Sequence, residues 1–341
     1  STPVSPKSEP LRDLFGEVDV PVVAAWGGGV DSTAMLIEMV ENGERIDAVL
    51  FADTGSEPPA VYAQVRLFKS WLETRGVLVV IVRYEPQRFK NFPRYSSLLE
   101  NCLVNGTLPS ISFGRHSCSI KWKIAPQDKW MASWEPALRV WSAGGKVIRL
   151  IGYDCSPADT RRYGHATSLG EDERYTYRYP LREWGWTRAD CEARIEAAGL
   201  PRFQKSSCFM CGSMRSEELR ALPPQLHRLI VLLEARAKPR LRNIDGLWRK
   251  PIQGKRGATP RPGSMTEFIR SEGLLPSDEI DEIIALAPQD LLAWQDAVAQ
   301  LESARPAMAE WVRLFERTST PAFSHPGLPA LFPHRPAPLA A

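Results

Sequence analysis

The sequence predicts an α/β fold, with an open, mostly parallel sheet covered by helices on both faces and a smaller helical region after it. Four short apolar runs have the composition of buried parallel strands. Helical patterns lie between these runs, and glycine or proline residues mark where elements begin and end. The expected strands are 20–26, 46–52, 77–84 and 147–152, and the helices expected among them are 33–42 and 59–74.

Local signals set the expected boundaries. Pro58 and Pro59 suit the first turn of the second helix, whereas Gly43 and Gly76 suit the ends of the two helices. Residues 86–145 are irregular and rich in aromatic and polar side chains, which indicates loops and short helices around a site. Later helices are expected at 187–198, 217–237 and 277–301.

We therefore expect four parts in the chain. The helix expected at 187–198 has Thr187 as a suitable N-cap. This helix and the C-x-x-C motif that follows it are the last features of the main domain. The parts are a flexible N-terminus (1–17), a nucleotide-binding domain with a cysteine cluster (18–215), a helical C-terminal region (216–319) that contains a basic loop (238–263), and a Pro-rich tail (320–341).

The composition is that of a globular protein. Of 341 residues, 43% are hydrophobic and 24% are charged, and no run approaches the roughly 20 apolar residues that cross a bilayer. The polar N-terminal segment has no apolar core of a signal peptide, so we expect a cytoplasmic protein without a membrane partner. Six cysteines are too few for a disulfide scaffold, which leaves reduced thiols, metal ligation or catalysis.

A glycine loop lies between the first expected strand and helix. Glycines let the backbone turn sharply and present bare N–H groups, hydroxyls add donors, and the positive end of the helix dipole points at the same place. An anion such as phosphate should bind there. The residues concerned are Gly27, Gly28, Gly29, Asp31, Ser32 and Thr33.

A tight strand-to-helix turn is the simpler interpretation of three glycines, and the spacing matches neither the dinucleotide fingerprint nor the Walker-A loop. The segment 27–32 resembles the PP-loop of the ATP pyrophosphatase superfamily, Ser-Gly-Gly-x-Asp-Ser, with Gly27 in place of the first serine. The resemblance implies an adenine nucleotide α-hydrolase-like fold, ATP with Mg²⁺ as cofactors, and Asp31 as a residue that places the metal or the ribose.

The second expected strand ends in an Asp-Thr-Gly turn formed by Asp53, Thr54 and Gly55. Parallel strands bring their carboxyl ends to one edge, so Asp53 could meet a nucleotide or its Mg²⁺ there. A plain turn is the alternative. The element resembles that of the sulfonucleotide-reductase branch of the same superfamily, whose members include phosphoadenosine phosphosulfate reductases.

Three cysteines have the spacing of a metal site. Cys208 and Cys211 form a C-x-x-C, and Cys118 lies far upstream. Three thiolates suit an iron–sulfur cluster with one open iron, whereas zinc would need a fourth ligand such as His116 or Cys155. Buried free thiols are the alternative.

The order of motifs from 20 to 215 resembles the reductase branch. A Pro-Leu-x-x-Trp segment at 180–184 and a helix precede the C-x-x-C, and Cys118 precedes Lys121, Lys123 and Pro126. The resemblance implies a cluster, most readily 4Fe–4S, held by Cys118, Cys208 and Cys211, with Cys155 or a substrate in the fourth position.

Two departures separate the chain from the reductases. There is no cysteine after Cys211, so the nucleophile that attacks the bound sulfonucleotide is missing, and a single cysteine at 118 replaces two in a row. A cluster with an open iron is similar to those of tRNA thiolases and of DNA phosphorothioation proteins in this superfamily.

The fourth expected strand ends at Gly152 and leads to an arginine pair at 161 and 162. The resemblance implies that Gly152 contacts the nucleotide and that Arg162 contacts its phosphate or sulfate. Arginine suits bidentate anion binding, although either arginine could simply be a solvated charge. We expect Lys121, Lys123 or Arg162 to offset charge at the α-phosphate, with Asp31 also in the catalytic group.

Between residues 238 and 262 there are eight Lys or Arg and one Asp, although the whole chain carries only +3. With Trp248 as a stacking aromatic, this segment suits nucleic acid, either tRNA or DNA, and equally a solvated loop.

We therefore expect an ATP-dependent sulfurtransferase that adenylates a substrate, with a sulfur or electron donor protein as partner and a homodimer left open. The alternatives are a sulfonucleotide reductase that uses a thiol partner and a non-catalytic, zinc-stapled nucleotide-binding module.

Overall fold

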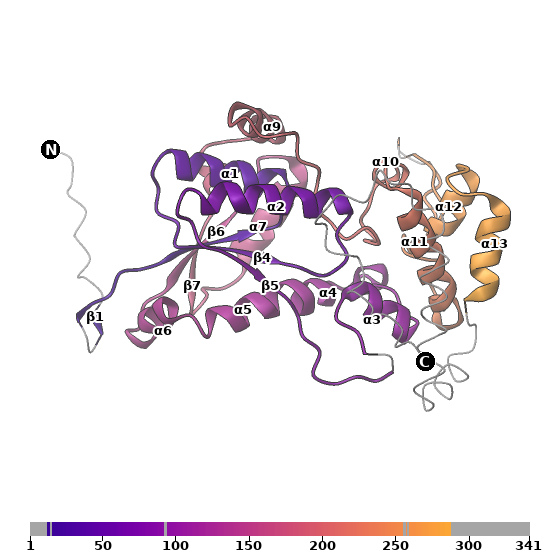
Figure 1. Ribbon diagram of the computed structural model, residues 1–341, viewed down its shortest axis with the longest axis horizontal. Coiled ribbons are helices and arrows are strands. Elements are labelled where there is room, and N and C mark those ends of the chain that lie inside the picture. Colours follow the sequence, from indigo (N-terminus) through magenta and orange to yellow (C-terminus); the bar gives the residue numbers. More distant parts are fainter. Residues whose placement is uncertain (1–11, 14–15, 92–93, 255–256, 258, 288–341) are drawn as a thin grey trace, which may run out of the picture. The chain divides into compact units, whose positions relative to one another are not determined.

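The computed structural model describes residues 12–13, 16–91, 94–254, 257 and 259–287 (Figure 1). These residues form two compact units, each built from separate stretches of sequence. The first, here called the sheet unit, contains the described residues up to Ala52 together with Ala63–Val82 and Ala125–Ser206. The second, the helical unit, contains Asp53–Tyr62, Arg83–Ile124 and the described residues from Ser207 onward. The chain leaves the sheet unit after Ala52, Val82 and Ser206 and returns to it twice.

The sheet unit contains a five-stranded, entirely parallel sheet with the strand order β5-β4-β3-β6-β7, which confirms the predicted α/β class. Four strands correspond to the four expected apolar runs. The fifth, β7, was not expected, because only Tyr175 among its four residues is buried and no apolar run marks it. The strands are β3 (Val22–Trp26), β4 (Ala48–Ala52), β5 (Val79–Val82), β6 (Val147–Ile151) and β7 (Tyr175–Arg178).

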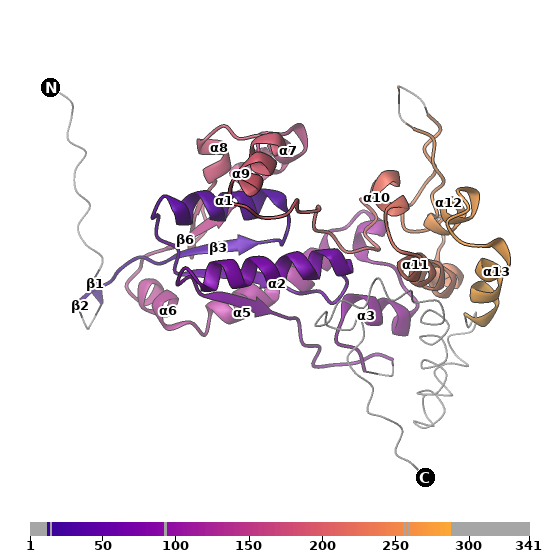
Figure 2. The same cartoon turned by 45° about the horizontal axis from the view of Figure 1, so that its top comes forward.

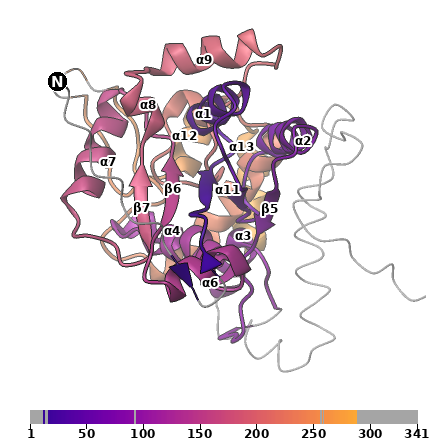
Figure 3. The same ribbon diagram turned by 90° about the vertical axis from the view of Figure 1, so that its left-hand side faces the viewer.

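Helices cover both faces of this sheet. Helices α1 and α2 lie on one face and α5 and α6 on the opposite face, while α9 packs along α1 (Figures 1, 2 and 3). The helices are α1 (Val30–Glu41), α2 (Pro59–Glu73), α5 (Ala125–Met131), α6 (Glu135–Ser142), α7 (Pro157–Ser168), α8 (Pro180–Glu183) and α9 (Arg188–Ala197).

Alternation along the strands supplies a core for each face. On β3 and β4, Val23 and Leu50 pack with buried residues of α5 and α6. Their neighbours point the other way, and Trp26 has its ring centroid 5.6 Å from that of Phe51 and 5.3 Å from that of Phe68 on α2. Strands buried on both faces are continuous apolar runs, which is why the sequence marked them.

The strand order determines where a ligand of this sheet should bind. From β3 the chain passes through α1 to β4 and then to β5, and it later returns on the other side of β3 as β6. Open parallel sheets bind ligands at the carboxyl ends of the strands where the order reverses in this way. Gly27 follows β3 and Gly152 follows β6, so both candidate residues flank that switch point.

The helical unit is built around α11, which is buried from Leu226 to Ala237. Residues of α3, α12 and α13 join its core, together with Trp122, Phe209 and Met210. Its helices are α3 (Leu98–Asn105), α4 (Ser117–Ser119), α10 (Ser216–Arg220), α11 (Pro224–Ala237), α12 (Met265–Ser271) and α13 (Ser277–Leu286), and its short turns are η1 (Ser110–Phe113), η2 (Ile120–Ile124) and η3 (Lys238–Arg240).

A buried carboxylate organises the C-terminal part of this unit. Glu234 accepts hydrogen bonds from the backbone N–H groups of Leu247 (2.7 Å), Met265 (3.0 Å) and Thr266 (2.8 Å) and from the hydroxyl of Ser264 (2.6 Å). Such charge-assisted bonds offset the cost of burying the charge. Glu234 thereby ties the start of α12 and the end of the basic segment to α11.

Two further features complete the described chain. The strands β1 (Arg12–Asp13) and β2 (Gly16–Glu17) form a small antiparallel pair inside the segment expected to be flexible. Among the residues that the structure describes, no helix is long and apolar enough to cross a membrane. The second half of the helix expected at 277–301 and the Pro-rich tail lie outside the described residues.

Candidate functional site

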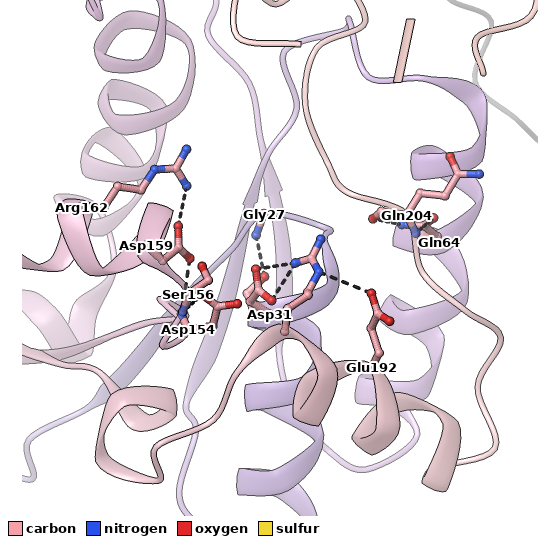
Figure 4. A network of polar contacts seen from close by, with 11 residues as sticks. Gly27, Asp31, Gln64, Asp154, Ser156, Asp159, Arg162, Glu192 and Gln204 are labelled. Atoms are coloured by element: carbon pink, nitrogen blue, oxygen red, sulfur yellow. Dashed lines mark hydrogen bonds and ion pairs between the residues drawn. The ribbon is translucent and has the colours of Figure 1, made fainter. Parts of the chain in front are cut away.

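The glycine loop makes the whole connection between β3 and α1. Gly28 has a φ of 75°, in the left-handed region that costs other L-residues about 1–2 kcal/mol. Gly29 is the N-cap of α1, and within the described chain no side chain caps it. The Ser32 hydroxyl accepts a hydrogen bond from the Gly27 N–H at 3.3 Å (Figure 4). The loop therefore offers backbone donors at a helix N-terminus, with Ser32 closing it.

Thr33 has a different role from the one expected. It is fully buried, and its Oγ1 accepts a hydrogen bond from the Trp26 Nε1–H at 3.0 Å. The hydroxyl therefore fastens the first turn of α1 to the end of β3. This corrects the expectation that the Thr33 side chain would act as a donor to a ligand.

Gly152 and Ser32 are far apart in the sequence but meet in the sheet unit. A Cβ atom on Gly152 would lie 2.8 Å from Cα and 3.0 Å from the backbone N of Ser32. Real Cβ atoms do not approach other atoms so closely, and backbone atoms cannot yield as a side chain can. The end of β6 thus fits against the start of α1 only because residue 152 is glycine.

Asp31, on the first turn of α1, is paired with an arginine of α9. Nη1 of Arg188 donates to both carboxylate oxygens, at 2.7 Å and 2.6 Å, and Nε of Arg188 lies 3.6 Å from Glu192 (Figure 4). Burial raises the pKa of Asp31, Arg188 opposes that rise, and the nearby charges of Asp154 and Asp159 add to it.

A second polar group follows β6. The Asp154 carboxylate accepts from the Ser156 N–H at 2.9 Å, and the Asp159 carboxylate accepts from the Asp154 N–H at 3.3 Å. Arg162 donates to Asp159 at 3.1 Å, and its side chain is 67% exposed (Figure 4). Arg162 is therefore available to solvent, but part of its charge is offset by Asp159.

A cavity of about 560 Å³ lies beside the first residue of α1. Apolar side chains such as Val30, Leu200 and Phe203 form part of its wall, and Glu192 and Glu196 add carboxylates. Glu192 also pairs with Arg188, so the cavity and the Asp31–Arg188 pair share a residue.

The Asp-Thr-Gly turn belongs to the helical unit and is internally bonded. Asp53 accepts from the hydroxyl of Tyr62 at 2.7 Å, from the Gly55 N–H at 2.9 Å and from Nε of Arg83 at 2.8 Å. Gly55 has a φ of 69°, and a Cβ there would lie 2.4 Å from Cβ of Ser97. Both oxygens of Asp53 thus hold this turn together.

The three candidate ligand thiols also lie in the helical unit. Thr54 Oγ1 is 3.3 Å from Sγ of Cys208, and Sγ of Cys211 is 3.0 Å from the hydroxyl of Ser213. Burial raises the pKa of Cys208 to about 12, with Glu57 adding to the rise. The backbone N–H of Cys118 donates to the Ser110 hydroxyl at 2.6 Å.

The two candidate catalytic lysines have partners within the same unit. Nζ of Lys123 lies 3.5 Å from the buried carboxylate of Glu57, and this carboxylate raises the pKa of Lys123, as do the thiols of Cys208 and Cys211 to a smaller degree. Nζ of Lys121 lies 4.9 Å from the centre of the Tyr84 ring. Lys123 is therefore a cation placed beside the C-x-x-C.

Cys155, the candidate fourth ligand, belongs to the sheet unit and not to the unit of the other three cysteines. Its N–H donates to the carbonyl of Trp186 at 2.8 Å, and its Sγ lies 3.9 Å from the carbonyl oxygen of Leu181. In the described part of the chain, no group of three or more His, Cys, Asp or Glu side chains is gathered closely enough to hold a metal ion.

In the basic segment, Ile252 and Arg261 form an isolated antiparallel bridge. Trp248 is only 3% exposed, donates through Nε1 to the Met214 carbonyl at 2.8 Å, and is covered by Arg261 at 4.2 Å from its ring centre. Trp248 is therefore a core residue, which corrects the expectation that it stacks on a base.

Sequence reasoning missed three side chains of these networks, Arg188, Arg83 and Glu57. A signal exists for Arg188, because it directly follows the N-cap Thr187, and a cation in the first turn opposes the helix dipole. Such a residue needs an acidic partner, but the sequence does not say which one.

No protein-family model matches the chain, and no curated protein matches it either.

The contact between Gly152 and Ser32 predicts that Gly152→Ala destabilises the protein. The added methyl must displace the first turn of α1, and overpacking of this kind costs about 1–3 kcal/mol. Gly164→Ala is the matched control, because a Cβ on this helical glycine meets nothing within 4 Å. Thermal unfolding should show a lower Tm for Gly152→Ala and an unchanged or higher Tm for the control. Equal Tm values for the two variants would contradict the packing described.

Proposed function

We propose that this protein is an ATP-using enzyme of the PP-loop type that adenylates its substrate. A substrate oxygen attacks the α-phosphorus of ATP, a new O–P bond forms, the bond to the β-phosphate oxygen breaks, and pyrophosphate leaves with that electron pair. The observation that carries the proposal is the glycine loop. It connects a central parallel strand to a helix N-terminus at the switch point of the sheet.

Each residue of the site has a separate role in the proposed reaction. The backbone N–H groups of Gly28 and Gly29 would hold phosphate oxygens, together with the hydroxyl of Ser32, which the Gly27 N–H orients. Asp31 is the carboxylate of the loop that would hold Mg²⁺, a hard cation that prefers oxygen ligands and phosphates. The exposed side chain of Arg162 would contact the phosphate or sulfate of the substrate.

The thiols of the helical unit support the second half of the proposal, sulfur transfer. Cys118, Cys208 and Cys211 are not gathered as a metal site among the described residues, so they would have to move together to hold an iron–sulfur cluster. Thiolates are the ligands that such clusters use, and the cation of Lys123 lies beside the C-x-x-C. A bound cluster would supply sulfur or electrons to the activated substrate. Thr54 would position Cys208 through the contact at 3.3 Å.

A nucleic acid is the acceptor that the charge distribution supports. In the basic segment the side chains of Lys238, Arg242 and Lys250 are exposed. Exposed cations bind the phosphate backbone without sequence preference, which suits a partner such as tRNA or DNA. The burial of Trp248 removes stacking from this part of the proposal and leaves electrostatics.

Calorimetry with ATP and Mg²⁺ tests the loop. The wild type should release or absorb heat, and Gly28→Ala should bind about fivefold to thirtyfold more weakly, since left-handed strain of about 1–2 kcal/mol falls on the loop. Gly76→Ala is the matched control, because Gly76 also has a left-handed φ and a Cβ there meets nothing within 4 Å, but it lies after α2 and outside the loop. A wild type without any heat of binding would overturn the proposal.

Anaerobic analysis of iron and sulfide tests the thiols. Iron should be lost from Cys118→Ser, Cys208→Ser and Cys211→Ser, whereas Cys155→Ser, altered in the other compact unit, should keep it. A zinc-loaded, colourless wild type would instead favour a non-catalytic nucleotide-binding module stabilised by zinc. Iron that is retained in the Cys118, Cys208 and Cys211 variants would remove these three cysteines from the ligand set.

The salt dependence of RNA binding tests the acceptor. Each phosphate contact contributes about 0.7–0.9 to the slope of log K against log salt concentration. The double variant Lys238→Gln/Arg242→Gln should therefore bind tRNA with a slope shallower by about 1.4–1.8. Exchanging the exposed carboxylate of Glu267, also in the helical unit, for Gln should not make the slope shallower. Equal slopes for the wild type and the double variant would exclude these two cations as contacts.

A further inference from the structure

The ion pair between Asp31 and Arg188 contains unused hydrogen-bonding capacity. Both hydrogen bonds to Asp31 come from Nη1 of Arg188, and within the described residues Nη2 donates to no acceptor. The Arg188 side chain is 36% exposed and that of Asp31 is 20% exposed. A guanidinium presents its donors as a planar fork, so one nitrogen can serve a carboxylate while the other serves a second anion.

The pair is not required merely to dock α9 on α1. Arg194, farther along α9, makes ion pairs with both Glu38 and Glu41 of α1. These bonds hold the C-terminal half of α9 in place, well away from the glycine loop. Arg188, in contrast, lies in the first turn of α9, where the helix dipole disfavours a cation. An electrostatically unfavourable position beside an anion-binding loop needs a reason other than docking.

We propose that Arg188 binds the phosphate chain of the nucleotide at the glycine loop, while its Nη1 stays on Asp31. This inference rests on the proposed function of that loop. The loop supplies only neutral donors and one carboxylate, so an arriving phosphate meets a negative charge on Asp31. Arg188 neutralises that charge and provides two further N–H donors from Nη2. Lysine could not do both, because its ammonium is a point charge without the fork.

Calorimetric titration of the full chain with inorganic pyrophosphate and with MgATP tests this role. Arg188→Gln should weaken both ligands by about tenfold to a hundredfold, the usual effect of losing a charge-assisted hydrogen bond. Arg194→Gln is the matched control, since it removes an arginine of the same helix that pairs with α1 but is remote from the loop. This control should bind within about twofold of the wild type.

Two outcomes would overturn the inference. One is an Arg188→Gln variant that binds like the wild type, and the other is an Arg194→Gln variant that loses as much affinity as Arg188→Gln. Failure of the proposed function is distinct, because then the wild type itself binds neither ligand. Circular dichroism and thermal unfolding of each variant verify that a loss of affinity does not reflect loss of the fold.

A substitution of Asp31, the other member of the ion pair, tests the same inference independently. Asp31→Asn abolishes the competing negative charge and leaves the cation of Arg188 in place. Without Mg²⁺, in the presence of a chelator, this variant should bind pyrophosphate several-fold more tightly than the wild type. Adding Arg188→Gln to Asp31→Asn should abolish the gain. A tighter complex that persists in the double variant would place the phosphate on other donors.

Discussion

The sheet unit depends on how closely β6 can approach the start of α1. In the parallel register Ala25 pairs with Ile151, so β3 and β6 end within one residue of each other. The chain then continues as the glycine loop on one side and as Gly152 on the other. Because Gly152 has no side chain, the backbone of Ser32 fits against it. This fit fixes the first turn of α1 at the switch point, and every candidate ligand contact of the loop depends on the placement of that turn.

The fold could be predicted from sequence where burial on two faces or a capping motif leaves a local mark. The continuous apolar run at β4 is buried throughout, and Thr187 is the expected N-cap of α9, where it forms a capping box with Asp190. Strand β7 escaped prediction because it lies at the edge of the sheet, where one buried tyrosine suffices. The two discontinuous units also left no local mark, since contacts between distant segments define them.

The candidate site also contains features that the sequence reveals and features that it does not. A glycine turn between a strand and a helix depends on neighbouring residues alone, so this element was visible in the sequence. The direction of a side chain is not local, and for that reason Thr33 and Trp248 face the core although their neighbours suggested ligand contacts. The partners of Asp31 and Asp53, which are Arg188 and Arg83, come from distant segments. Only the packed chain identifies them.

Charge decides what kind of ligand suits the loop. Burial raises the pKa of the Asp31 carboxyl, Arg188 opposes that rise, and Asp154 and Asp159 add to it. A bare anion would add more negative charge beside these carboxylates, and the dipole of α1 offsets only part of it. A nucleotide that arrives with Mg²⁺ brings its own positive charge, and Arg188 supplies another. Under the proposed function, these charges would therefore favour a nucleotide that carries Mg²⁺ over a free phosphate, with Arg188 as the cation paired with Asp31.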